Sequence, residues 1–288
     1  MELLVGANGL FGKMYRNVHP NSDSIISIDR TNASLLFGES NNDTIDLFAL
    51  EVLLKKLRPN RVIYAAQYSD YRSFDEQDIR KMNRVNVLQP VALAEVLSRL
   101  GIPGTFFSSG SVYAPKPAPL LETDPLKVPY ESEPYVASKI TFENILHANQ
   151  LLAGMILLRP FVMFGVGQRP SSLIPKLIRN ISSGISVYLN GESGLIVNPI
   201  PIQLAVAAVN ELHFRRLEGV FNLAGNNSYS IAEIATRIAT LLNKDVHFEH
   251  HSVEGEAVLL GDICKLQSAT GLELLNDIDS FLTDMIST

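Results

Sequence analysis

Short apolar runs alternate with longer amphipathic stretches through the first half of the chain. The runs predict buried strands, and the stretches between them, with apolar residues recurring at helical spacing, predict helices. Strands that alternate with helices are typical of βαβ units, so the pattern predicts an α/β fold with a parallel sheet. The predicted strands are 3–5, 25–28, 61–66, 104–109 and 155–158.

Two helical patterns are longer than the others. One runs from about Asp75 to Leu100, where Pro90 either kinks the helix or starts a second segment, and the other covers 135–153. Shorter amphipathic patterns predict packing helices at 48–57, 231–242 and 278–286.

Composition limits the class of protein. A chain of 288 residues with 46% hydrophobic and 19% charged residues is long enough for a large core or two subdomains. A net charge of −6 argues against a nucleic-acid partner, and the most apolar stretch, 151–166, is too short and too interrupted for a membrane span. A single cysteine, Cys264, excludes an internal disulfide, and the first residues lack a signal-peptide pattern, so we expect a cytoplasmic protein.

Three glycines follow the first strand at regular spacing. Gly6 can adopt the dihedrals of a tight turn, Gly9 leaves the backbone open to a pyrophosphate, and Gly12 lets the next helix pack closely on the strand. The helix N-terminus would add free N–H groups and partial positive charge. An ordinary strand-to-helix turn can have the same spacing, so the nucleotide interpretation depends on context. The loop residues expected to contact the cofactor are Gly6, Asn8, Gly9, Leu10, Phe11 and Gly12.

Asp29 supplies that context. It ends the apolar run 25–28, roughly 20 residues beyond the loop, where an acid accepts hydrogen bonds from the adenosine ribose. Its carboxylate would repel a 2′-phosphate and so favours NAD over NADP, although Arg30 could soften that preference. The alternative is a plain surface aspartate after a strand.

Tyr135 and Lys139 lie four positions apart in a predicted helix, which places both side chains on one face. A phenol ionises near pH ~10, so its use at neutral pH requires about 4 kcal/mol of stabilisation of the phenolate. A neighbouring ammonium and a nicotinamide cation can supply it, and Ser109 at a strand end could hydrogen-bond the reacting oxygen. Such a Tyr and Lys pair is common on helices, so the ordered set of motifs carries the argument.

That set resembles the extended short-chain dehydrogenases/reductases, also called the NAD-dependent epimerase/dehydratase family. The glycine spacing, the strand end 108–113 (SSGSVY) and the pair Tyr135-x-x-x-Lys139 are all similar to family motifs, and the resemblance covers most of the chain. It implies that Ser109, Tyr135 and Lys139 are catalytic, and that Tyr135 and Lys139 also touch the cofactor. The other cofactor contacts that it implies are Asp46 and Leu47 at the adenine, Ala65 and Ala66 along the cofactor, Asn83 near it, and Phe161 beside the nicotinamide.

The resemblance also implies an architecture. We expect a Rossmann-type doubly wound parallel sheet with a smaller carboxyl-terminal α/β substrate domain. The implied NAD-binding domain is 1–164, with a return segment near 195–225, and the substrate domain is 165–288. Family members commonly pair through two long helices, here 75–100 and 135–153, so we expect a homodimer.

Substrate-side residues depart from the family pattern. The family commonly carries an arginine and acidic residues near the substrate diphosphate and an asparagine after the nicotinamide Phe. Here those positions hold Val197, Asn198, Gln203, Leu204 and Val162. A nucleotide-activated sugar is therefore expected as the substrate by resemblance alone.

The same comparison narrows the reaction. Gly110 and Ser111 replace the acidic pair of the 4,6-dehydratases, and Ser111 stands where GDP-fucose synthases carry a cysteine. These differences leave a 4-ketoreductase, which we favour because Val162 and Val197 give little polar hold on a keto-sugar, or a 4-epimerase that retains NAD. A non-catalytic NAD sensor or structural subunit is a third hypothesis, and the intact catalytic set argues against it.

Three histidines, His247, His250 and His251, fall in one predicted strand, where 247 and 251 share a face and 250 points away. Three histidines without supporting carboxylates are weak evidence for a metal site, so we expect solvated histidines and no bound metal.

Overall fold

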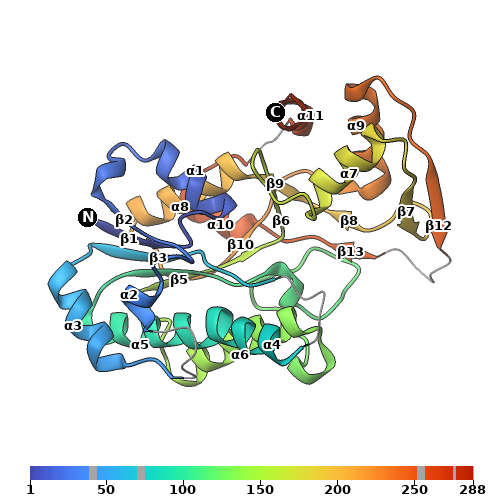
Figure 1. Ribbon diagram of the computed structural model, residues 1–288. Coiled ribbons are helices and arrows are strands. Elements are labelled where there is room, and N and C mark those ends of the chain that lie inside the picture. Colours follow the sequence, from blue (N-terminus) through green and yellow to red (C-terminus); the bar gives the residue numbers. More distant parts are fainter. Residues whose placement is uncertain (39–43, 70–74, 252–256, 275–276, 288) are drawn as a thin grey trace. The chain divides into compact units, whose positions relative to one another are not determined.

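A six-stranded sheet with the order β10-β5-β4-β3-β1-β2 contains the strands predicted in the first half of the chain (Figure 1). The structure, a computed structural model, describes residues 1–38, 44–69, 75–251, 257–274 and 277–287. The chain divides into two units. The first contains Met1–Ala114, Pro125–Arg159 and Leu212–Phe221, and the second contains Pro115–Asp124, Pro160–Glu211 and Asn222–Thr288.

The predicted parallel sheet is confirmed. β1 pairs in parallel with both β2 and β3, β3 pairs with β4, and β4 pairs with β5. Because β2 and β3 lie on opposite sides of β1, the winding of the sheet reverses there, and ligands of open α/β sheets bind at such a point. The strands are β1 (Glu2–Val5), β2 (Ile25–Ile28), β3 (Arg61–Tyr64), β4 (Gly104–Phe107), β5 (Met155–Pro160) and β10 (Gly219–Leu223).

Two strands end earlier than predicted, β3 at Tyr64 and β4 at Phe107. Each keeps one more backbone hydrogen bond to its neighbour, from Ala65 N to Val5 O at 2.8 Å and from Ser108 N to Leu158 O at 2.7 Å. The chain then leaves the sheet, so the residues predicted to touch a ligand lie in loops just beyond the carboxyl ends of the strands.

The long helix predicted at 75–100 contains a π-helical turn, η2 (Arg84–Leu88), between α4 (Glu76–Asn83) and α5 (Gln89–Leu100). Pro90 lies in the first turn of α5, where its missing N–H costs no hydrogen bond. The other long helix, α6 (Pro134–Ala148), ends before the predicted Ala153, because the chain turns at Gln150, which has a φ of +55°.

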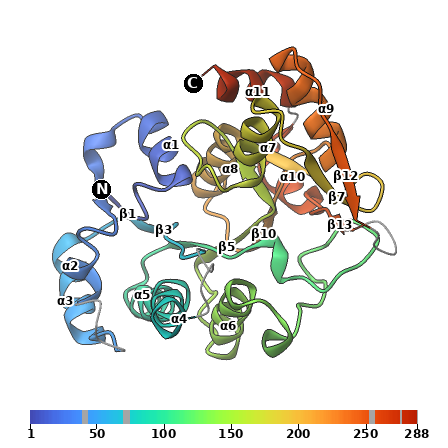
Figure 2. The same cartoon turned by 45° about the vertical axis from the view of Figure 1, so that its right-hand side comes forward.

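Helices cover both faces of the sheet in the first unit. α3, α4, α5 and α6 lie on one face and α1 lies on the other (Figures 1 and 2). The core includes Leu3 and Val5 of β1, Leu54 of α3 and Leu93 of α5, all nearly fully buried. The remaining elements of this unit are α1 (Leu10–Val18), η1 (Ser22–Ser24), α2 (Ser34–Phe37), α3 (Leu47–Leu57), η3 (Gly110–Val112) and η4 (Pro129–Glu131).

The second unit has its own core, in which α7 packs on α9 and the predicted helices 231–242 and 278–286 are confirmed as α9 and α11. Ser230 and Glu233 form a reciprocal capping box at the start of α9, which satisfies two backbone N–H groups. Its helices are α7 (Leu173–Ser182), α8 (Ile202–Phe214, which ends in the first unit), α9 (Ile231–Leu242), α10 (Cys264–Thr270) and α11 (Ile278–Ile286).

Short strands complete the second unit. β11 and β13 flank β8, β12 pairs with β7, and β6 pairs with β9. Their bounds are β6 (Val162–Phe164), β7 (Val187–Asn190), β8 (Ile196–Val197), β9 (Pro199–Pro201), β11 (Tyr229–Ser230), β12 (Phe248–His251) and β13 (Val258–Leu259).

The chain passes from the first unit to the second between Arg159 and Pro160 and returns for Leu212–Phe221, whereas the sequence predicted a boundary after 164 and a return near 195–225. The excursion Pro115–Asp124 into the second unit has no counterpart in the prediction. No helix in the described part of the chain is both long and apolar enough to cross a bilayer.

Candidate active site

The glycine loop joins β1 to α1 and is shaped by close backbone packing. Gly6 has a φ of +93°, and a Cβ built on it would lie 2.5 Å from Ala66 N. A Cβ on Gly12 would lie 2.4 Å from Gly6 O, so these two positions accept only glycine without backbone movement. The nearest atom to a Cβ on Gly9 is 3.3 Å away, and Gly9 offers no side chain to cap α1. The first turn of α1 therefore keeps N–H groups available for an anion.

Side chains of the loop have different surroundings. The Phe11 ring is buried, with its centroid 4.7 Å from that of Phe107, so only the backbone of Phe11 can reach a ligand. Leu10 is half-buried, and Asn8 is exposed. Asn8 Nδ2 donates to Asp29 Oδ2 at 2.5 Å, which brings the predicted ribose acid to the glycine loop.

Asp29 follows β2 and is held by three donors. Its Oδ1 accepts from Thr31 N at 2.7 Å and from Thr31 Oγ1 at 2.6 Å, in addition to the bond from Asn8. The hydrogen bonds from Thr31 hold the pKa of the Asp29 carboxyl below its usual range. A fixed anion thus lies beside the phosphate loop, while Arg30 next to it is exposed.

Asp46 caps α3, accepting a hydrogen bond from Ala49 N at 3.0 Å, and Leu47 starts that helix. Ala65 and Ala66 follow β3 directly. Ala66 is partly buried and packs against the core of the first unit. Their backbone lies against Gly6, as the distances from a Gly6 Cβ show. Ala65 and Ala66 therefore lie next to the position between β1 and β3 where the winding of the sheet reverses.

Two serines at the end of β4 point in opposite directions, as successive residues of an extended chain do. Ser108 Oγ donates to Glu143 Oε1 in the interior. Ser109 Oγ accepts from Ser111 N at 3.2 Å and caps the short helix η3. The serine predicted to be catalytic is therefore the one that faces away from the buried carboxylate.

Tyr135 and Lys139 lie one turn apart on α6, with Lys139 Nζ 5.9 Å from the centre of the Tyr135 ring. Lys139 is 1% exposed and donates from Nζ to Phe107 O at 2.8 Å. Burial lowers the pKa of Lys139 to about 8, and the Glu143 carboxylate opposes that change. The ammonium is thus fixed beside the phenol and bound to the strand that leads into Ser109.

Sequence reasoning missed four residues around this site. Gln67 Oε1 accepts from Tyr135 Oη at 3.1 Å, and Asn86, which is fully buried, bonds both Tyr68 and Ser138. The other two, Glu143 and Arg159, form a buried ion pair. Their signal in the sequence was that Arg159 is the one charged residue of β5 and Glu143 the one acid of α6.

Asn83, which the resemblance placed near the cofactor, is exposed at the end of α4. Asn86, one turn further along, is the asparagine linked to α6, since Asn86 Nδ2 donates to Ser138 Oγ at 3.0 Å. A role of Asn83 at the cofactor stays a prediction.

Phe161 belongs to the second unit, where its N–H donates to Leu223 O at 3.1 Å. Its ring covers Gly261 so closely that a Cβ there would lie 2.4 Å from Phe161 Cε2. Asn198, one of the substituted substrate-side positions, has a structural role, because it exchanges hydrogen bonds of 2.8 and 3.0 Å with the backbone of Gly261.

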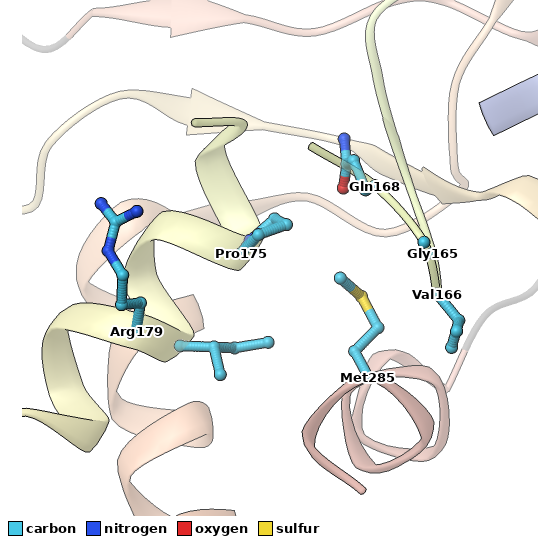
Figure 3. A pocket seen from close by; sticks show the side chains of 8 residues that line it. Gly165, Val166, Gln168, Pro175, Arg179 and Met285 are labelled. Atoms are coloured by element: carbon cyan, nitrogen blue, oxygen red, sulfur yellow. The ribbon is translucent and has the colours of Figure 1, made fainter. Parts of the chain in front are cut away.

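A pocket of about 280 Å³ lies in the second unit beside α7 and α11 (Figure 3). Gly165, Gln168, Arg179 and Met285 are among its lining residues. Gln168 Nε2 donates to Met163 O at 2.9 Å, so this side chain is used within its own loop. Elsewhere in this unit, His247, His250 and His251 are all exposed, and the described residues contain no cluster of side chains that could hold a metal ion.

Two curated proteins are similar to this chain. A GDP-6-deoxy-D-talose 4-dehydrogenase from Aggregatibacter actinomycetemcomitans is 24% identical over 186 residues, which are 62% of this chain and 58% of that protein. A GDP-6-deoxy-D-mannose reductase from Pseudomonas aeruginosa is 29% identical over 128 residues, 43% of this chain and 42% of that protein. The matches thus span about half the length of these relatives.

Solved structures share the whole fold. A dTDP-4-dehydrorhamnose reductase from Clostridium acetobutylicum superposes with a TM-score of 0.80 at 18% identity, over 100% of this chain and 99% of the other. The model of the NAD dependent epimerase/dehydratase family matches residues 3–195, which include the glycine loop, Asp29 and the whole of α6. This chain therefore belongs to the NAD dependent epimerase/dehydratase family.

Proposed function

We propose that this protein is an NAD(H)-dependent oxidoreductase that reduces a keto group of a nucleotide-activated sugar. One observation carries the proposal: Lys139 Nζ lies beside the Tyr135 ring and is bound to Phe107 O, two residues before Ser109. That bond ties the three catalytic groups together in the unit that holds the glycine loop. The names of both curated relatives, a dehydrogenase and a reductase of GDP-6-deoxy sugars, support an oxidoreductase over other classes.

The residues present fit a dinucleotide. Gly6 and Gly12 keep the loop tight, Gly9 leaves room for a pyrophosphate, and Asp29 offers a fixed anion for a ribose diol. The Asp29 carboxylate would repel a 2′-phosphate, which supports NAD over NADP. When bound, the cofactor supplies the hydride. Asp46, Leu47, Ala65, Ala66 and Phe161 remain proposed contacts of its other parts.

The chain's own residues would handle the proton. In the reduction direction Tyr135 Oη donates its proton to the carbonyl oxygen, which becomes the hydroxyl oxygen of the product. The charge of Lys139 stabilises the phenolate that remains, and Ser109 hydrogen-bonds the reacting oxygen so that it faces Tyr135. The carbon that gains the hydride and the oxygen that gains the proton belong to the same carbonyl.

Cofactor retention separates reduction from 4-epimerisation, which is the second candidate. An epimerase oxidises and re-reduces the same carbon, so its NAD stays bound, whereas a reductase must exchange NAD for NADH in every cycle. We expect the dialysed protein to carry little nucleotide, as measured by release on denaturation, and to consume NADH with a nucleotide-linked 4-keto-sugar. Close to one retained NAD per chain, with inversion at C4 and no added cofactor, would replace the reductase by the epimerase.

Retained NAD without turnover of any nucleotide sugar would favour the non-catalytic sensor instead. The proposal also includes a cytoplasmic location, supported by the single cysteine, and a homodimer formed through α4, α5 and α6, of which α4 and α5 both contact α6 within the first unit. Light scattering of the purified protein tests the homodimer, and a monomeric mass would exclude it.

A further inference from the structure

Gln67 contacts the atom that would transfer the proton. It follows Ala66 at the carboxyl end of β3, its side chain is exposed, and its Oε1 accepts from Tyr135 Oη at 3.1 Å. This exposed amide lies next to the phenolic oxygen without belonging to α6 or to the Ser109 loop.

The backbone beside Gln67 is clamped by one buried side chain. Asn86 Oδ1 accepts from Tyr68 N at 2.8 Å, and Asn86 Nδ2 donates to Tyr68 O at 2.8 Å. Asn86 is 0% exposed and lies in the π-helical turn η2, a type of turn that is frequent at functional sites. The residue after Gln67 is therefore fixed at both of its polar backbone groups.

The same asparagine reaches the catalytic helix. Asn86 Nδ2 donates to Ser138 Oγ at 3.0 Å, and Ser138 Oγ donates to Tyr135 O at 2.7 Å. One chain of hydrogen bonds through Asn86 and Ser138 thus links the backbone beside Gln67 to the backbone of Tyr135. The side chains of the two residues also meet, with Gln67 Oε1 3.1 Å from Tyr135 Oη. These bonds fix the backbone next to Gln67 relative to the backbone of Tyr135, so the Gln67 side chain starts within reach of the phenolic oxygen.

We propose that Gln67 is a further catalytic residue, whose amide accepts from the Tyr135 hydroxyl in the resting site and donates to the phenolate once the hydroxyl has turned to the carbonyl oxygen and given up its proton. The inference rests on the proposed reduction. In that step the phenolic O–H bond breaks as the carbonyl oxygen takes the proton, and the remaining phenolate needs a donor. Rotation of the amide exchanges Oε1 for Nε2–H, so glutamine serves both states without adding a charge. Glutamate, when ionised, could only accept.

The test compares Gln67→Met, Gln67→Glu and the matched control Gln77→Met, which alters an exposed glutamine on α4. Ultraviolet difference absorbance follows formation of the Tyr135 phenolate in the presence of NAD, with Tyr135→Phe as the baseline. Loss of one hydrogen bond to a charged group should move the titration midpoint of Gln67→Met up by about one pH unit and lower kcat about tenfold. Gln67→Glu should move the midpoint further, because its carboxylate opposes the phenolate.

The control variant should match the unaltered protein in titration, kcat and thermal unfolding. The assignment would be overturned if Gln67→Met and Gln67→Glu had the same Tyr135 titration midpoint and the same kcat as Gln77→Met. The titration requires no sugar substrate, so it decides on Gln67 even if the unaltered protein reduces no keto-sugar, an outcome that would instead refute the proposed function.

Discussion

The carboxylate of Glu143 on α6 and the guanidinium of Arg159 on β5 form an ion pair with two parallel contacts, with Nε–Oε1 and Nη2–Oε2 distances of 3.1 and 2.5 Å. Their side chains are 0% and 3% exposed. Glu143 also accepts from Ser108 Oγ, and Arg159 Nη1 donates to Tyr113 Oη at 2.8 Å. The pair therefore ties α6 to β5 and to both ends of the loop that carries Ser109.

Glu143→Gln should destabilise the fold by about 3 kcal/mol, because it leaves the Arg159 charge buried without a counter-charge. The control is Glu76→Gln, which removes one member of an exposed pair with Arg80 and should cost less than about 1 kcal/mol. Urea unfolding measures both. The double variant Glu143→Met/Arg159→Met should regain part of the loss, since no charge remains unpaired. Equal stability of the two single variants would show that the buried pair is dispensable.

Tyr135→Phe should lower kcat by at least about 100-fold, since the ring stays and only the proton donor is lost. NADH binding, followed by calorimetry, should stay within about twofold, because a hydroxyl contributes little when the ring packing is kept. Tyr188→Phe, at an exposed tyrosine of the second unit, is the matched control. Near-normal turnover of Tyr135→Phe on the true substrate would remove Tyr135 from the mechanism.

Asp29 should set the choice of cofactor. The unaltered protein is expected to bind NAD more tightly than NADP. Asp29→Ala should reduce the ratio of the two dissociation constants about tenfold, because it removes both a hydrogen-bond acceptor and a repulsive charge. Asp23→Ala, at an exposed aspartate that precedes β2, should leave the ratio unchanged. Calorimetric titration with each nucleotide measures the ratio. Equal affinities in the unaltered protein would contradict the role given to Asp29.

His213 should make stability depend on pH. Its Nε2 lies 2.7 Å from Thr105 Oγ1 on β4, and burial, aided by the charge of Arg61, lowers its pKa from 6.5 to about 3. Between these values the unfolded chain binds a proton that the folded chain does not, so stability falls as the pH is lowered, by up to about 1.4 kcal/mol per pH unit.

The unfolding free energy of the unaltered protein should therefore fall when the pH is lowered from 7 to 5. For His213→Asn, the fall in unfolding free energy over the same interval should be smaller by up to about 2 kcal/mol. His147→Asn, at an exposed histidine of α6, serves as the control. Parallel pH dependence of His213→Asn and the unaltered protein would show that folding leaves the pKa of His213 unchanged.

Local motifs in the sequence predicted the sheet, and the proposed site residues also rest on such motifs. The glycine spacing, Asp29 and the pair Tyr135 and Lys139 each depend on short stretches of chain with a fixed geometry, such as one turn of helix. Helix ends were less predictable, since α6 stops at Ala148 because of a left-handed turn at Gln150 that no glycine or proline announces.

The supporting residues could not be read from the sequence, because their partners are distant along the chain. Gln67 meets Tyr135 across 68 positions and Asn86 meets Ser138 across 52. The π-helical turn between α4 and α5 also changes which side chains face α6, and nothing in the spacing of Asn83 and Asn86 indicates that turn.

The first unit is built from three separate stretches of the chain, and the last of them, Leu212–Phe221, includes the start of the sheet's final strand. During synthesis the ribosome must therefore add more than fifty residues after Arg159 before β5 can acquire β10 as its neighbour and Thr105 can meet His213. Until then β5 pairs only with β4, and its other side is an open sheet edge, which is a template for association with other chains. Chains that terminate between Arg159 and Leu212 should consequently aggregate, even though they contain every residue assigned to catalysis.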